Sequence, residues 1–428
     1  MKLDYRRTIL VGLAFMSICL FWQIYDSIIP LILKNTFDIN DTLSGAVMAL
    51  DNVLALFMLP LFGMFSDKTN TKIGRRMPYI IGGTAAAVIL MVLIPYADNI
   101  SSLPVFIAVL ALVLICMSTY RSPAVALMPD VTPKPLRSKG NAVINLMGAV
   151  GGIISLGLVA FLVPKVDKPD YLPLFGVVAV IMLISVLILF FTTNEKKLSV
   201  KMIEESKELS IDDEIKEENK ESVKLPPDKR KSLLLILASV FLWFMGYNAV
   251  TTAFSKYAQV YWNLEGGLFA YTLIVANVAA ILSYIPVGFL ASKIGRRKTI
   301  LCGIILLTFA FGAAMFFESF SALILFFFAL AGIAWASINV NSYPMVVEMS
   351  KGNDVGKYTG FYYTFSMAAQ IVTPILSGAV LQYMGYKWLF PYGTLFVALS
   401  FVTMFFVKHG DSRPNTPKSK LEAFSGDD

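Results

Sequence analysis

A short motif that occurs twice in the chain decides the fold. The first copy begins with Pro60-Leu-Phe-Gly63-Met-Phe-Ser-Asp67 and ends with Ile73-Gly74-Arg75-Arg76. The second copy is Pro286-Val-Gly288-Phe-Leu-Ala-Ser292-Lys-Ile294-Gly295-Arg296-Arg297, which is four residues shorter between the two parts. Each copy separates the second and third apolar runs of its half of the chain. Because sequence and position agree, we interpret the chain as two repeated halves.

Long apolar runs surround both copies. Of the 428 residues, 57% are apolar and only 15% are charged, against ~25% charged in soluble domains. A helix crosses a bilayer with ~20 mostly apolar residues. Soluble enzymes, nucleic-acid-binding proteins and secreted disulfide scaffolds are therefore disfavoured, and we predict an all-α membrane protein with twelve transmembrane helices in two six-helix halves. The runs are 8–33, 42–65, 77–96, 102–129, 137–163, 171–193, 232–257, 264–291, 298–317, 320–347, 354–383 and 387–407.

Lysine and arginine set the orientation, because they accumulate on the cytoplasmic side of membrane proteins. With both termini in the cytoplasm, the opposite side holds only five of the 36 basic residues, and Arg121 lies within a run. The other thirty fall in cytoplasmic segments. We therefore predict cytoplasmic termini and attribute the net charge of +7 to topology, with no nucleic-acid partner. The first run is too long for a signal peptide, so we expect it to be retained.

A highly charged segment at 194–231 interrupts the apolar pattern. It cannot bury an apolar face, so we expect a solvated loop, with or without a surface helix. The predicted domains are therefore a six-helix bundle at 1–193, the loop at 194–231, a second bundle at 232–408 and a cytoplasmic tail at 409–428.

Residues suited to catalysis or metal binding are scarce. The three cysteines lie in apolar runs, and the single histidine, His409, ends the last run. Their spacing predicts no disulfide, no metal site and no cofactor. Since the chain also lacks a nucleotide-binding loop and a nucleophile–base set, we predict that it is not an enzyme.

With these features the chain resembles the major facilitator superfamily. The six-plus-six layout, the central loop and the duplicated Gly-x-x-x-Asp…Gly-Arg-Arg motif carry the resemblance, which covers nearly the whole chain. The segments 63–79 and 120–130 are similar to the sucrose/disaccharide branch of the glycoside–pentoside–hexuronide:cation symporter group. The resemblance implies a proton-coupled sugar symporter. Sodium symporters of the wider group carry aspartates where this chain has Ala55 and Leu59, which favours protons.

Three charged residues lie well inside apolar runs, away from their ends: Asp26, Asp51 and Arg121. Burying such a charge costs at least ~2.5–3.5 kcal/mol, so these residues usually face a polar cavity and act there. We expect Asp51 to carry the coupled proton, Asp26 to serve both proton and sugar, and Arg121 to stabilise the deprotonated state or to bind substrate. The alternative is a static polar network that holds the helices together.

Aromatic and amide side chains inside the runs are suited to sugar binding, because sugars need hydrogen-bonding groups and an apolar ring face. The alternative is that the amides hydrogen-bond between helices. The candidates are Trp22, Gln23, Tyr25, Asn145, Trp243, Tyr247, Asn248, Trp335, Asn339 and Gln370.

The repeated motif also suggests a gate. In related transporters this loop holds the cytoplasmic side closed, and the resemblance implies the same role for Gly63, Asp67, Gly74, Arg75 and Arg76. For Arg75 and Arg76 the alternative is that they only set the orientation in the membrane. Asp130 with Arg137 forms a second expected latch. In the second half Ser292 replaces the aspartate, so we expect the two copies to differ in strength.

The sequence thus predicts a secondary transporter that works by alternating access, with a disaccharide or glycoside and protons as partners. A proton-coupled drug or metabolite antiporter of the same superfamily is the alternative. A membrane sensor without transport is disfavoured by the buried charges. We expect a monomer in the lipid bilayer, as a multi-pass protein of a bacterial inner (plasma) membrane.

Overall fold

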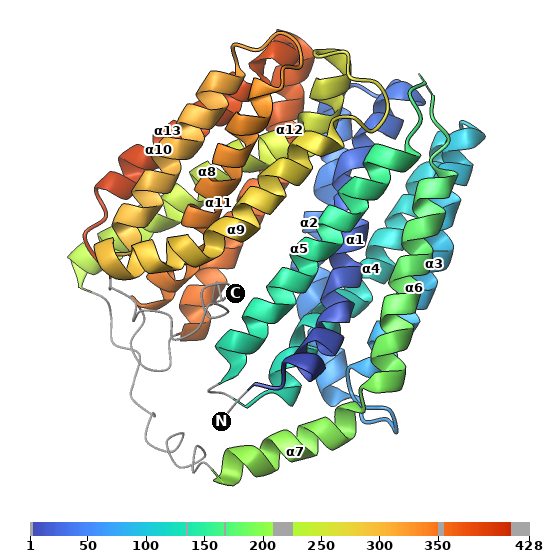
Figure 1. Ribbon diagram of the computed structural model, residues 1–428, viewed down its shortest axis with the longest axis vertical. Coiled ribbons are helices and arrows are strands. Elements are labelled where there is room, and N and C mark those ends of the chain that lie inside the picture. Colours follow the sequence, from blue (N-terminus) through green and yellow to red (C-terminus); the bar gives the residue numbers. More distant parts are fainter. Residues whose placement is uncertain (1–2, 134–135, 167, 209–225, 350–354, 412–428) are drawn as a thin grey trace. The chain divides into compact units, whose positions relative to one another are not determined.

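A computed structural model describes residues 3–133, 136–166, 168–208, 226–349 and 355–411 (Figure 1). Within these ranges the fold is helical, and twelve of the helices are long and apolar enough to cross a membrane. The helices are α1 (Tyr5–Asn35), α2 (Asp41–Lys68), α3 (Met77–Asn99), α4 (Leu103–Val131), α5 (Arg137–Leu162), α6 (Leu172–Thr192), α7 (Glu195–Glu208), α8 (Pro227–Val260), α9 (Ala270–Ile294), α10 (Arg296–Ala314), α11 (Leu323–Val347), α12 (Val355–Met384), the 3₁₀ helix η4 (Tyr386–Trp388) and α13 (Leu389–Phe405).

These helices confirm the predicted fold class. Every predicted apolar run coincides with one long helix, and most ends agree within a few residues. The largest shifts occur in the second half. Helix α9 begins at Ala270, six residues after the start of its predicted apolar run, and α8 begins at Pro227, five residues before the start of its run. Proline fits the first turn of a helix because it lacks only an N–H that has no partner there. The helix therefore starts in polar sequence. The helix α7 lies in the segment predicted as a charged loop.

The chain forms two compact units. Unit 1 comprises Met1–Ile39, Leu50–Asp212 and Glu265–Tyr271, and in it α1 packs on α5 and α6 while α3 packs on α4 and α6. Unit 2 comprises Asn40–Ala49, Asp213–Leu264 and Thr272–Asp428, and in it α8 packs on α12 and α13 while α10 packs on α11 and α13. Helix α2 therefore contributes its first turns to unit 2 and the rest to unit 1.

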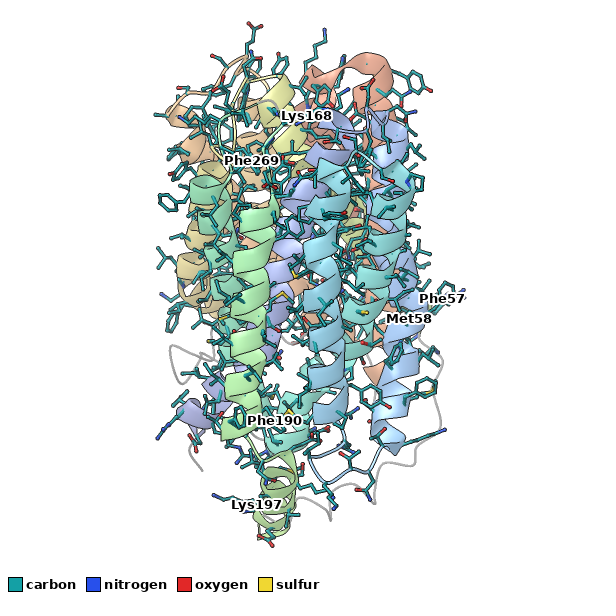
Figure 2. All side chains as sticks on the ribbon, turned by 90° about the vertical axis from the view of Figure 1, so that its right-hand side faces the viewer. Phe57, Met58, Lys168, Phe190, Lys197 and Phe269 are labelled. Atoms are coloured by element: carbon teal, nitrogen blue, oxygen red, sulfur yellow. The ribbon has the colours of Figure 1, made fainter. Side chains whose placement is uncertain are left out.

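The outside of unit 1 carries large apolar side chains along its length. Phe57 is 68% exposed and projects away from the helices in Figure 2, and Phe161 and Phe191 are 80% and 79% exposed. In the same view Lys168 and Lys197 lie near opposite ends of the unit. An apolar surface between charged ends is what a bilayer requires of a multi-pass protein. In each unit we call the end with the Gly-Arg-Arg motif the basic end.

Candidate functional site

Unit 1 brings the three intramembrane charges together. Asp26 lies on α1, Asp51 on α2 and Arg121 on α4, and all three side chains are half-buried. Arg121 interacts electrostatically with both carboxylates, and the charge of Asp51 also acts on Asp26. Their placement predicts one polar group rather than three isolated charges. We call Asp26, Asp51 and Arg121 the charged triad.

Specific contacts hold two members of the triad. The guanidinium carbon of Arg121 lies 5.4 Å from the centre of the Trp22 ring, a cation–π contact. Asn52 Nδ2 donates a hydrogen bond of 2.8 Å to Asp51 Oδ1. Among the described residues no carboxylate oxygen comes within 4.0 Å of an Arg121 nitrogen. The guanidinium edge therefore keeps its donors for another group.

The predicted sugar-binding residues of unit 1 differ in how far they are exposed, and Trp22 contacts the triad through Arg121. Trp22 and Gln23 are half-buried on α1, and Asn145 is half-buried on α5. The indole N–H of Trp22 has no hydrogen-bond partner in the described part of the chain. Tyr25 differs from these residues, because its side chain is only 1% exposed and packs in the helix core. On α1, Trp22 lies one turn before Asp26 and so shares its side of the helix.

The predicted sugar-binding residues of unit 2 include an aromatic group. The rings of Tyr247 on α8 and Trp335 on α11 stack with centroids 3.6 Å apart and planes 5° apart. Phe244 meets the edge of Trp335 at 5.3 Å. Both stacked residues are half-buried, as is Asn339 one turn further along α11. The cluster thus combines the aromatic rings of Tyr247 and Trp335 with the amide of Asn339.

Two predicted residues of unit 2 are oriented differently from what we expected. Trp243 was placed beside Tyr247 by its spacing of four residues, but its side chain is fully buried, with 0% exposure. Gln370 on α12 donates to the Ser366 carbonyl of its own helix at 3.3 Å. Helical spacing shows which residues share a face and does not show how deeply that face is buried. Asn248 is half-buried, and its amide nitrogen lacks a partner among the described residues.

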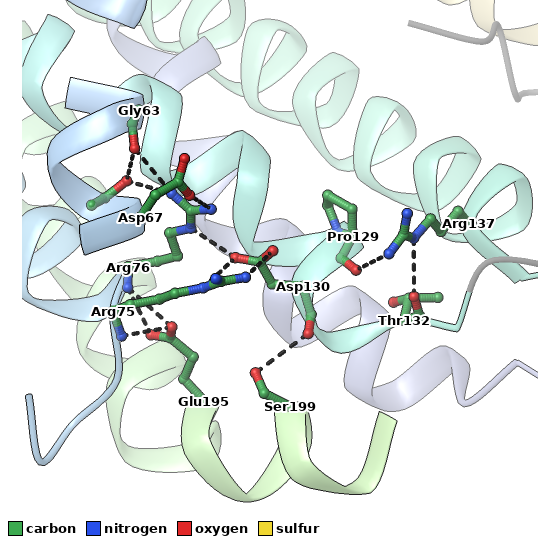
Figure 3. Close-up of polar contacts among 11 residues, drawn as sticks. Gly63, Asp67, Arg75, Arg76, Pro129, Asp130, Thr132, Arg137, Glu195 and Ser199 are labelled. Carbon is green, nitrogen blue, oxygen red and sulfur yellow. Dashed lines mark hydrogen bonds and ion pairs between the residues drawn. The ribbon is translucent and has the colours of Figure 1, made fainter. Parts of the chain in front are cut away.

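An ion-pair network links the helices at the basic end of unit 1 (Figure 3). Arg76 pairs with Asp67 at the end of α2 and with Asp130 on α4, the latter at 2.7 Å. Arg75 also pairs with Asp130, at 2.6 Å. Burial would lower the pKa of Arg76, but its hydrogen bond to Asp130 and the charges of Asp130 and Asp67 raise that pKa above its ordinary value. Arg76 thus stays charged and joins three helices.

The glycine of this loop also brings α2 and α4 together. A Cβ added to Gly63 would lie 3.1 Å from the Ser122 hydroxyl of α4. The Gly63 carbonyl accepts a hydrogen bond from Arg76 Nη1. The close approach that we expected of a glycine at this position is present.

The central component of the network, Glu195, was missed in the sequence. It begins α7, and its carboxylate accepts hydrogen bonds of 2.8–3.1 Å from the backbone N–H groups of Arg75, Arg76 and Met77. These are free N–H groups at the start of α3, which attract a negative charge. Gly74, with φ +123°, makes the turn before them, and a Cβ there would meet Glu195 Oε2 at 2.1 Å. The sequence did not predict this role of Glu195, because the residue is one of many acids in a segment that we interpreted as a solvated loop.

Arg137 does not form the predicted latch with Asp130. Its guanidinium donates to two backbone carbonyls near the end of α4, Pro129 at 3.0 Å and Thr132 at 3.2 Å. Asp130 is already paired with Arg75 and Arg76, which lie opposite it on the first loop. Arg137 therefore ties the start of α5 to the end of α4 through carbonyls.

The second copy of the motif repeats part of this network. Arg296 pairs with Glu348 at 2.9 Å, and Asp411 accepts a hydrogen bond from the Arg297 N–H at 2.9 Å. Gly295 has φ +94°, like its counterpart Gly74. Ser292, however, donates to the Phe289 carbonyl of its own helix. The cap and one cross-helix pair are thus duplicated, and the pair made by Asp67 is not.

Comparisons with known proteins agree with this architecture. Residues 11–281 and 263–426 match the model of the Major Facilitator Superfamily. The fold is similar to the inward-open xylose transporter XylE from E. coli, with a TM-score of 0.69 at 13% identity over 98% of both chains. It is equally similar to the nucleoside transporter NupG, with a TM-score of 0.69 at 12% identity over 94% of this chain and 100% of that one.

Two curated proteins are similar to this chain in sequence. The chain is 28% identical to the "Sucrose transport protein SUC3" of Arabidopsis thaliana over 138 residues, which are 28% of this chain and 23% of that protein. It is 23% identical to the "Isoprimeverose transporter" of Lactiplantibacillus pentosus over 283 residues, 64% of this chain and 56% of that protein. The matches thus span between a quarter and just over half of these relatives.

The twelve helices that are long and apolar enough to cross a membrane define a multi-pass membrane protein, and the solved structures share its fold. Because the family model matches most of the chain, the protein belongs to the Major Facilitator Superfamily.

Proposed function

We propose that this protein is a proton-coupled sugar symporter that works by alternating access, with both termini in the cytoplasm. The observation that carries the proposal is the charged triad of Asp26, Asp51 and Arg121 on three helices of unit 1. The alternative, a proton-coupled drug or metabolite antiporter, shares the fold and is distinguished by the experiment below.

The charges of the triad support coupling to protons. Two carboxylates and one guanidinium carry a net charge of −1, so one added proton makes the group neutral. A neutral group is cheaper to enclose within the membrane than a charged one. In our proposal Asp51 takes the coupled proton, Asp26 serves both proton and sugar, and Arg121 stabilises the carboxylates once the proton has left.

Protons fit the surroundings of Asp51 better than a sodium ion does. One helical turn and two turns beyond Asp51, where a sodium-binding helix would add carboxylates, α2 carries Ala55 and Leu59. Asp51 instead accepts a hydrogen bond from the side-chain amide of Asn52.

The neighbouring residues support a sugar as substrate. Near the triad, Trp22 and Gln23 supply an aromatic ring and an amide, and in unit 2 Tyr247, Trp335 and Asn339 supply the same two kinds of group. Sugars are bound by such combinations of hydrogen-bonding groups and ring surfaces. The names of the two curated relatives, a sucrose and an isoprimeverose transporter, agree with this class.

The ion pairs at the basic end of unit 1 suit a cytoplasmic gate. They connect α2, α3 and α4 through Arg76, and α7 adds the carboxylate of Glu195. In our proposal this network keeps unit 1 rigid at the cytoplasmic end while the two halves change their facing.

Transport by purified protein in liposomes tests the proposal. Radiolabelled disaccharides, monosaccharides and a cationic dye are offered under an inward proton gradient, an inward sodium gradient or none. We expect sugar uptake that needs the proton gradient. Export of the dye without sugar uptake would favour the antiporter, and sodium-driven uptake would overturn the proton assignment.

The variant Asp51→Asn tests the coupling residue directly. It keeps the shape of the side chain and removes the titratable group, so we expect it to lose proton-driven accumulation while sugar exchange across the membrane continues. The matched control is Asp38→Asn, whose side chain is 95% exposed and lies outside the triad. Accumulation by Asp51→Asn at the unmodified rate would contradict the role of Asp51.

A further inference from the structure

A second buried ion pair lies at the end of unit 2 opposite its basic end. Lys256 Nζ is 2.7 Å from Asp41 Oδ1, and the two side chains are 5% and 6% exposed. Lys256 is in the last turns of α8, and Asp41 is the first residue of α2. The pair therefore joins the start of a helix from the first half of the chain to a helix of the second half.

Further polar contacts surround this pair. Tyr386 of η4 donates a hydrogen bond of 2.8 Å to the same carboxylate oxygen of Asp41, and Lys256 Nζ donates to Ser44 Oγ at 3.3 Å. One residue along α2, both the N–H and the hydroxyl of Thr42 donate to Gln382 Oε1 of α12, at 3.2 and 2.6 Å. Both buried charges are thus satisfied by contacts that exist only while the start of α2 is seated here.

The backbones also touch at this seat. A Cβ added to Gly45 of α2 would lie 1.9 Å from the Pro374 carbonyl oxygen of α12. A Cβ on Gly378 of α12 would lie 2.2 Å from the Asp41 carbonyl oxygen. Such an approach is open only to glycine. Two small residues and one ion pair therefore define a single fitted contact between α2, α8 and α12.

We infer that the Asp41–Lys256 pair is a releasable latch that closes the transport pathway at its non-cytoplasmic end. The inference rests on the proposed alternating access, and it adds the residues that hold this end. Helix α2 has its first turns in unit 2 and its remaining turns in unit 1. A change of facing at this end must separate those first turns from α8 and α12. Separation at the glycines breaks only van der Waals contacts. At the ion pair, each ion must exchange its partner for water.

The energetics favour a latch over a permanent tie. A buried ion pair gains little over hydration of its two ions, because desolvation offsets the Coulomb attraction. The paired and the separated, hydrated forms are therefore close in free energy, as a switch requires. Removing one partner is different, because it leaves the other charge buried alone. Single substitutions should shift the equilibrium toward the separated form, and exchange of the two charges should restore it.

Cross-linking measures whether the latch is closed. Thr42→Cys and Gln382→Cys are combined in a chain whose Cys19, Cys116 and Cys302 are replaced by serine. A short bifunctional maleimide then bridges the two positions only when α2 is seated. We expect Lys256→Met to reduce the bridging rate roughly tenfold or more, and Asp41→Lys with Lys256→Asp to restore it. Elution as a single species and a cooperative melting transition confirm that each variant is folded.

Transport by the bridged protein completes the test. We expect the bifunctional reagent to stop sugar uptake and a monofunctional maleimide, which labels both cysteines without joining them, to leave most of it. Uptake by bridged protein at the unbridged rate would overturn the latch. Bridging that is unaffected by Lys256→Met would overturn the role of the ion pair. If bridged protein still takes up sugar, the latch is wrong and the proposed function stands. If no sugar is transported at all, the proposed function is wrong, and the bridging rates still test whether the ion pair holds α2 in place.

Discussion

The two copies of the Gly-Arg-Arg loop share a framework and differ in their charges. In each copy a glycine with positive φ, Gly74 or Gly295, turns the chain. An acid that follows the last membrane helix of the same half, Glu195 or Asp411, caps the helix after this turn. The first arginine of each motif pairs with an acid at the end of the fourth membrane helix of its half, Arg75 with Asp130 and Arg296 with Glu348. The first loop adds Asp67, which pairs with Arg76. In the second, Ser292 bonds to its own helix, and among the described residues Arg297 has a side-chain contact only with the Phe405 carbonyl.

This difference separates what the duplicated fold requires from what one half adds. The turn and the cap are needed wherever a helix starts immediately after a sharp reversal, since its first N–H groups must find acceptors. The ion pairs of Arg76 are not needed for that, because the second loop folds without a counterpart. Among the described residues the first loop therefore has more ion pairs than the second, and its greater strength stays a prediction.

Removing the central arginine of each loop should show the largest contrast. Arg76→Ala deletes both ion pairs and leaves Asp130, whose side chain is 14% exposed, with Arg75 alone. Loss of one partner of a buried pair costs about 3 kcal/mol. Arg297→Ala deletes a hydrogen bond to a carbonyl, which is worth about 1 kcal/mol. The free energy of unfolding in mixed micelles with increasing SDS measures both, and equal losses would show that the extra ion pairs of the first loop contribute nothing.

The capping acids should give a smaller contrast in the same direction. Glu195 accepts from three backbone N–H groups, whereas Asp411 has one such bond, to Arg297. Loss of a helix cap costs about 0.5–2 kcal/mol. We expect Glu195→Ala near the upper limit and Asp411→Ala near the lower one, measured by the same unfolding assay. Glu195→Gln is the control, because it keeps an acceptor oxygen and loses only the charge, and it should fall between the unmodified protein and Glu195→Ala.

The helices could be predicted from the sequence because the surrounding medium is a lipid bilayer. In a bilayer every backbone polar group must be satisfied within the helix, so apolar runs of sufficient length have one available structure. The triad could be predicted for the same reason, since Asp26, Asp51 and Arg121 are costly wherever they stand. Both arguments need only the composition of a segment.

Contacts that depend on which residues meet could not be predicted in this way. Glu195 and Asp411 cap helices more than a hundred residues away in sequence, and each lies in a segment interpreted only as polar. Lys256 was counted toward topology, and its pairing with Asp41 depends on how α2 is seated on α8. Trp243 shares a helix face with Tyr247 and is nevertheless fully buried. Periodicity gives the direction of a side chain and leaves its depth to tertiary packing.

Restoring an acid to the second loop should have the smallest effect and sharpens the comparison most. Ser292→Asp places a carboxylate at the position that corresponds to Asp67, on a chain where Arg297 Nε has no partner among the described residues. An ion pair exposed to solvent contributes only about 0.2–1 kcal/mol, so we expect a gain within that range that disappears at high salt. The control is Ser292→Asn, which adds a similar volume without charge. If Ser292→Asp destabilises the protein or gains equally at high salt, the asymmetry of the two loops does not come from the missing aspartate, and the four extra residues of the first loop become the feature to exchange next.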